Sequence, residues 1–120
     1  MEQSGVTGTM DVVEHRPGVR GLLVCGEIDS IEADVLERSA IALLDSAPDL
    51  VVVDLGEVRY FGSRGMTALL RIQWAAAEVG ARLRVVTGAA NRPVIRPLTI
   101  TGLDRELALF SDAAAALRDI

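Results

Sequence analysis

Ser63 is the residue of this chain whose position is best suited to chemistry. It follows Gly62, and the apolar residues after it recur at the spacing of an amphipathic helix, at Met66, Leu69 and Leu70. A hydroxyl at the mouth of a helix faces free backbone N–H groups and the positive end of the helix dipole, which favour an added phosphate. Serine is also a common helix cap. The pattern therefore leaves two roles open for Ser63, a cap and a phosphate acceptor.

The sequence lacks the motif and the base that usually accompany a catalytic serine. In the hydrolase motif G-x-S-x-G a glycine stands two residues before the nucleophile, but this chain has Phe61 there. The single histidine, His15, is expected on a different edge of the sheet, so no base is evident to activate the hydroxyl. One histidine and one cysteine are too few for a metal centre. We predict no enzyme activity, no catalytic residue, no metal and no cofactor.

The composition restricts the class of protein. The chain has 120 residues, of which 50% are hydrophobic and 3% aromatic, so it forms one domain with an aliphatic core. The scarcity of aromatic residues argues against a platform for stacking bases, and a net charge of −5 disfavours nucleic acid and anionic membranes as partners. No apolar stretch is long enough for membrane insertion, and no secretory signal is visible. We expect a cytoplasmic protein.

The charges are unevenly distributed along the chain. Residues 27–57 hold nine acidic residues and one basic residue, whereas residues 59–105 hold eight arginines and two acidic residues. One interpretation is two solvated faces of the domain. The other is a polar docking surface for a protein partner.

Hydrophobic periodicity and turn residues predict an alternating order of strands and helices, β-β-α-β-α-β-α-β-α. Residues 1–9 are predicted to be a flexible N-terminus and residues 10–120 the domain. Residues 54–61 are expected to carry the chain out of the sheet, and Ser111 to cap the last helix. The fold class is α/β, with helices packed on one mixed sheet of four to five strands. The strands are expected at 10–15, 21–28, 50–55, 83–86 and 107–110, and the helices at 29–46, 64–79, 92–101 and 111–117.

Local signals support individual elements. Asp29 and Glu32 have the spacing of a capping box at the start of the first helix. Gly80 is placed to end the second helix, and Trp74 is expected to be half-buried on it. The inward stripe of the first helix is expected at Leu36, Ala40, Leu43 and Leu44.

Three segments at the right spacing resemble the STAS domain of bacterial anti-anti-sigma factors, of the sporulation and stress-response type. The similarity extends over nearly the whole chain. The segments are Gly26-Glu27-Ile28-Asp29, Val53-Asp54-Leu55-Gly56-Glu57-Val58 and the ten residues from Phe61 to Leu70. The last is similar to the family's phosphoacceptor segment, in which the residue before the serine is most often aspartate.

The resemblance implies a regulatory switch without catalysis of its own. The unphosphorylated protein would bind an anti-sigma factor that is also a serine kinase, and this kinase would phosphorylate Ser63 and end the complex. A separate phosphatase would reset the serine. The residues implied in partner binding are Asp29, Ser30, Gly62, Ser63, Arg64, Gly65 and Thr67.

The chain departs from the family pattern on both sides of the serine. Gly62 stands in place of the usual aspartate, and Arg64 stands where a small hydroxyl residue is common. A guanidinium there could hold a phosphate or an acidic group of a partner. Two alternatives stay open: a constitutive, non-phosphorylated STAS docking module in a signalling or transporter assembly, and a small-ligand sensor.

Overall fold

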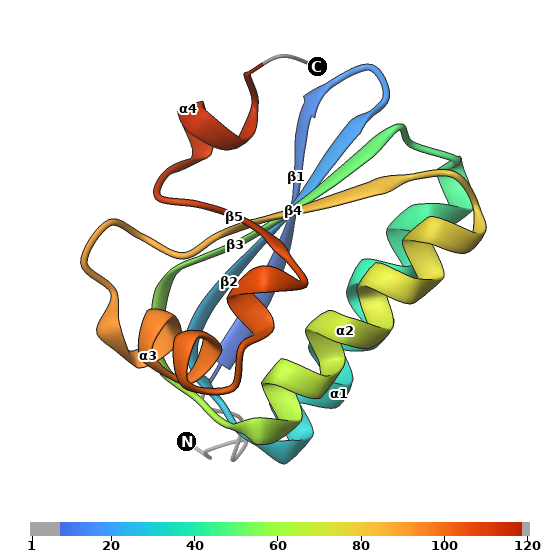
Figure 1. The fold of residues 1–120 in the computed structure, drawn as a ribbon. Helices are drawn as coiled ribbons and strands as arrows, with labels where there is room; N and C mark the ends of the chain where they lie inside the picture. The colour runs from blue at the N-terminus through green and yellow to red at the C-terminus, as the bar shows by residue number, and fades with distance from the viewer. Residues whose placement is uncertain (1–7, 119–120) are drawn as a thin grey trace, which may run out of the picture.

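A mixed sheet forms the centre of the molecule (Figure 1). The computed structural model describes residues 8–118, and within them five strands pair in the order β1-β2-β3-β4-β5. β1 is antiparallel to β2, and the other neighbouring strands are parallel. The strands are β1 (Gly8–Arg16), β2 (Val19–Ile28), β3 (Leu50–Phe61), β4 (Arg82–Val86) and β5 (Ala108–Phe110). The helices are α1 (Ser30–Leu43), α2 (Ser63–Glu78), α3 (Arg92–Ile100) and α4 (Ala113–Ala116). The predicted α/β class and order of elements are confirmed.

The helices cover the sheet unequally. α1 and α2 lie side by side on one face, whereas the short α4 lies on the other face (Figure 1). The larger core fills the space beneath α1 and α2, and α3 contributes Val94 and Leu98 to it. The smaller core joins Ala116 of α4 to strand residues such as Leu50 and Val52. Val53, Val51 and their neighbours are thus buried on both sides of the sheet, which explains their continuous apolar run.

The N-terminal hairpin begins earlier than the sequence predicts. Gly8 and Thr9 pair with Gly26 and Cys25 in the sheet, so they belong to β1 and not to a flexible terminus. Residues 1–7 lie outside the described residues. The hairpin turns at Gly18, whose φ of +81° is a conformation that glycine adopts at little cost. β1 and β2 are therefore direct neighbours.

The two long helices follow the sequence signals closely. Each of the four stripe residues predicted for α1 is buried. Asp29 is the N-cap of α1, and its backbone N–H donates to the Glu32 carboxylate at 3.2 Å, as in a capping box. At the end of α2, Gly80 has a φ of +76°, and the Ala81 N–H donates to the Ala76 carbonyl at 2.9 Å. This is a Schellman ending, which stops the helix where predicted.

β3 is longer than the predicted strand, which ends at residue 55. The strand continues to Phe61, paired on one side with β2, while β4 accompanies it only as far as Asp54. The pairing of β2 with β3 shifts twice, so β3 holds extra residues opposite β2. Where β4 leaves, the side-chain amide of Asn91 donates to the Leu55 carbonyl at 2.9 Å. One-sided pairing and two bulges break the regular alternation by which a strand is recognised.

Two smaller predictions are wrong. The N-cap of α4 is Asp112 and not Ser111, and its carboxylate accepts from the Ala115 N–H at 2.8 Å. Trp74 is 61% exposed, so it is not half-buried. Its place on α2 faces away from the stripe formed by Leu69, Ile72 and Ala76.

Candidate functional site

The starts of α1 and α2 lie together at one edge of the sheet. β2 leads directly into α1 and β3 leads directly into α2, and these two strands are parallel neighbours. The Gly62 N–H donates to the Ile28 carbonyl at 3.2 Å, which joins the two strand ends just before the helices begin. Residues more than 30 positions apart in the sequence, such as Asp29 and Ser63, are thereby brought to the same edge. We call this region the docking edge and define it by Asp29, Ser30 and the first turn of α2.

Ser63 is the first residue of α2 and not its cap. Gly62 is the N-cap, because its N–H still bonds to β2 while its carbonyl accepts the first helical bond, from the Met66 N–H at 3.2 Å. The serine is exposed, and its hydroxyl is not used to cap the helix. The capping interpretation of Ser63 is therefore wrong, and its side chain lies at the surface beside the free N–H groups of the helix start.

The predicted site residues differ in accessibility. Gly65 is buried, and a Cβ added there would lie 2.7 Å from Cε1 of Phe61, so this glycine lets the ring pack beneath the helix. Gly62 is half-buried. Those that are exposed are Asp29, Ser30, Ser63, Arg64 and Thr67. The exposed members bring three hydroxyl residues, Ser30, Ser63 and Thr67, to the surface at or near the starts of α1 and α2.

A second aromatic ring lies on the outer side of the same turn. A Cβ added to Gly62 would lie 2.9 Å from the Tyr60 hydroxyl oxygen and 3.3 Å from its Cε2. Tyr60 is 50% exposed, whereas Phe61 is only 3% exposed. The two glycines at the start of α2 thus accommodate two consecutive aromatic residues, one outside and one inside the domain.

The electrostatics differ between the two helix starts. α1 has a carboxylate at its N-cap, Asp29, and a buried one, Glu32, in its first turn. α2 has a glycine N-cap, no acidic residue in its first turn and an exposed cation, Arg64. Among the described residues Arg64 forms no salt bridge. The first turn of α2 therefore supplies no negative charge to compensate the positive end of its own helix dipole.

Sequence reasoning missed apolar side chains around the docking edge. Ile31, at the second position of α1, is 62% exposed, and Ile100, the last residue of α3, is 71% exposed. Thr101, next to Ile100, places its Oγ1 3.7 Å from Sδ of Met66 in α2. For the two isoleucines the signal was present, because both fall outside the inward stripe of their helix. No sequence signal predicts the exposure of Tyr60, because it is a bulge in the pairing of β2 with β3 that turns this residue outward.

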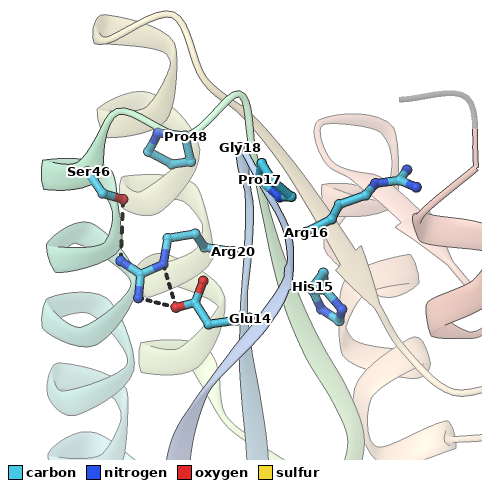
Figure 2. Close-up of a pocket in the computed structure, with 8 residues that line it drawn as sticks. All are labelled: Glu14, His15, Arg16, Pro17, Gly18, Arg20, Ser46 and Pro48. Carbon is cyan, nitrogen blue, oxygen red and sulfur yellow. Dashed lines mark hydrogen bonds and ion pairs between the residues drawn. The ribbon is translucent and has the colours of Figure 1, made fainter.

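An open hollow at the other end of the sheet, near the β1–β2 turn, does not assemble a comparable site (Figure 2). Its two arginines point in opposite directions along the turn. Arg20 is engaged by the Glu14 carboxylate and by Oγ of Ser46, and Arg16 donates to the Leu117 carbonyl at 3.0 Å. Their hydrogen bonds are already directed to protein groups, so the hollow offers no converging donors.

Two kinds of feature are absent from residues 8–118, a metal-binding cluster and a membrane-spanning helix. No group of three or more histidine, cysteine, aspartate or glutamate side chains there could hold a metal ion. In the same residues, no helix combines the length and the apolar character needed to span a membrane.

The fold agrees with a sequence comparison. The sequence profile of the STAS domain matches residues 12–116, and the chain belongs to this family. The element order and the mixed sheet confirm the predicted STAS fold.

Relatives that are at least 30% identical to the chain include antagonists of anti-sigma factors. The chain is 31% identical over 112 residues to the anti-sigma-F factor antagonist RsfB of Mycobacterium tuberculosis, covering 93% of this chain and 88% of the relative. The crystal structure of an anti-sigma factor antagonist from Mycobacterium paratuberculosis is 30% identical, with a TM-score of 0.79 over 92% of each chain. The anti-sigma factor antagonist SpoIIAA in its unphosphorylated form has a TM-score of 0.74 over 92% of this chain and 95% of its own, at 13% identity. This last similarity concerns the fold alone.

Proposed function

We propose that this protein is an anti-sigma factor antagonist that binds a serine-kinase anti-sigma factor through the docking edge and is switched off by phosphorylation of Ser63. One observation carries the proposal: an exposed serine stands at the first position of α2, a helix whose first turn contains no acidic residue. The 31% identity to an anti-sigma-F factor antagonist supports the identity of the partner. The protein would act in the cytoplasm, and a phosphatase would reset it.

A phosphate on Ser63 would have opposite effects in the free protein and in the complex. It carries about −1.5 to −2 charges at neutral pH. In the free protein these charges would lie at the uncompensated start of α2, next to the guanidinium of Arg64. In the complex they would be desolvated against the partner. A difference of about 3 kcal/mol between the two situations weakens binding more than a hundredfold.

The proposed role is binding and not catalysis. Ser63 lies where β2 ends, whereas His15 lies near the start of β2, beside the β1–β2 turn. The ten residues of β2 span roughly 30 Å. No imidazole is therefore within reach to activate the serine as a nucleophile.

The phosphorylation step is tested with the purified anti-sigma kinase of the host and ATP. We expect one added phosphate on the wild-type chain by intact-mass spectrometry, and none on Ser63→Ala. Ser111→Ala is the matched control, because this exposed serine lies next to the start of α4, outside the docking edge, and its loss should leave phosphorylation unchanged. An unmodified wild-type chain, under conditions in which the complex forms, would refute the switch.

The effect on affinity is tested by titration calorimetry with the same anti-sigma factor. Ser63→Asp introduces part of the charge of a phosphate, and we expect it to raise the Kd at least tenfold without loss of fold. Equal affinities of wild type and variant would favour the constitutive docking module, in which no kinase modifies this surface.

A further inference from the structure

The ring of Tyr60 occupies the space that a side chain at position 62 would need. Its hydroxyl oxygen and its Cε2 and Cζ atoms lie 2.9, 3.3 and 3.4 Å from the position that a Gly62 Cβ would occupy. The ring therefore rests on the backbone of the N-cap residue of α2, one residue before Ser63. Although half of its surface is exposed, the ring has a defined support.

Tyr60 belongs to the small set of large hydrophobic residues that are exposed in the described part of the chain, and its partner across the sheet is Glu27 of β2, an exposed acidic residue. Of the six large hydrophobic residues exposed in the described part of the chain, three belong to elements that meet near the start of α2: Tyr60, Ile31 and Ile100. They come from β3, α1 and α3, and contacts at Gly62 and Met66 hold these elements together. The other three lie elsewhere, on β1 or toward the end of α2: Val12, Trp74 and Val79.

We propose that Tyr60 is the anchor of the interface with the anti-sigma factor and that Gly62 is the residue that positions it. This inference rests on the proposed function, which supplies the partner. Tyrosine buries a large apolar area, keeps a polar tip and loses little conformational entropy, and such residues dominate binding energy at interfaces. A ring already supported by Gly62 loses still less freedom on binding.

Arg64, four residues after Tyr60 and in the first turn of α2, indicates part of the chemistry of the partner surface. Arg64 is exposed and forms no salt bridge within the described residues, so it is available to a carboxylate of the partner. The matching surface is therefore an apolar pocket for Tyr60 with an acidic group at its rim. A phosphate on Ser63 would compete with that acidic group for the same guanidinium.

The anchor is tested by titration calorimetry of purified variants against the host anti-sigma factor. We expect Tyr60→Ala to raise the Kd at least about 30-fold, the scale of an interface hot spot. Trp74→Ala is the matched control, since Trp74 is an even more exposed aromatic residue farther along α2, and it should change the Kd less than twofold. Thermal unfolding of both variants reports whether the fold is kept.

The role of Gly62 is tested by a double-mutant cycle. Gly62→Ala adds the Cβ that displaces the ring, while its φ of −86° is open to alanine. We expect this substitution to raise the Kd about tenfold in the wild-type background and less than twofold in the Tyr60→Ala background. An equal loss in both backgrounds would overturn the positioning role, because Gly62 would then act independently of the ring.

The possible outcomes separate this inference from the proposed function. If Ser63→Asp weakens the complex but Tyr60→Ala behaves like Trp74→Ala, the anchor is refuted and the switch stands. If Tyr60→Ala weakens the complex but Ser63→Asp does not, the anchor stands and the switch is refuted. If the wild-type chain binds no anti-sigma factor of its host, both are refuted.

Discussion

The uncompensated start of α2 leads to a stability prediction that requires no partner. Ser63→Asp would place a carboxylate at the first position of a helix whose N-cap is Gly62 and whose first turn contains Arg64 but no acidic residue. A negative charge at such a position stabilises a helix by about 0.3–1 kcal/mol at low ionic strength. For a domain of this size, we expect the melting temperature to rise by about 1–4 °C.

The chain offers a matched control for this substitution. Ser30 is also an exposed serine at the first position of a helix, but α1 already has Asp29 at its N-cap and Glu32 in its first turn. A third carboxylate there would be repelled by the two that are present. We therefore expect Ser30→Asp to leave the melting temperature unchanged or to lower it.

The assay is thermal unfolding followed by circular dichroism at 10 mM and at 1 M salt. The Debye length falls from about 30 Å to about 3 Å between these conditions. The gain from Ser63→Asp should therefore be present at 10 mM and largely lost at 1 M. Equal shifts for Ser63→Asp and Ser30→Asp, or a gain that persists at 1 M salt, would refute the electrostatic reasoning on which the phosphate site depends.

Three further predictions concern the elements that support the site. Gly65→Ala should destabilise the domain by a net of about 1–2 kcal/mol in chemical denaturation, because a Cβ 2.7 Å from a buried ring outweighs the better helix propensity of alanine. Leu98→Ala should cost about 2–5 kcal/mol, since this side chain is fully buried beneath α3, whereas Trp74→Ala should stay within about 0.5 kcal/mol. Asp112→Ala should lower stability by about 1 kcal/mol, and Ser111→Ala should have little effect, which thermal unfolding of the pair would show.

The parts of the fold that could be predicted from the sequence are those where local signals and burial agree. In α1 the capping spacing of Asp29 and Glu32 marks the start, and the stripe that includes Leu36 and Ala40 faces the core. The parallel β3-α2-β4 unit follows from a buried apolar run, an amphipathic helix and Gly80 at its end. Each of these features depends on residues close in sequence, so a reader of the sequence can find it.

The end of β3 could not be predicted, because its conformation depends on β2. Two register shifts between these strands leave Gly56 and Glu57 both exposed, and likewise Arg59 and Tyr60. Because a regular strand alternates exposed and buried residues, two consecutive exposed residues are more typical of a loop. The bulges are a property of the pairing and not of the residues alone, and they turn Tyr60 toward solvent beside the docking edge.

The caps predicted at Ser63 and Ser111 are wrong for a similar reason, because in each case a neighbouring residue makes the contact that defines the cap. At α2 the backbone of Gly62 is held by β2, so the helix begins after the glycine and the serine enters the first turn. At α4 the competing residue Asp112 is a charged acceptor and takes the cap from Ser111. In both places serine has the right propensity but its neighbour has the better contact.

The contacts around the start of α2 limit how a phosphate on Ser63 could act. The start of α2 is fixed on three sides: Gly62 is hydrogen-bonded to β2, Phe61 packs beneath Gly65, and Tyr60 rests on the outer backbone. Moving this turn would break a strand contact and expose a buried ring, which costs several kcal/mol by the scale of core substitutions. A phosphate that gains about 1 kcal/mol from the helix dipole cannot drive such a change. The proposed switch must therefore work by charge at the interface, and the backbone of the phosphorylated protein should match that of the unphosphorylated one around Ser63.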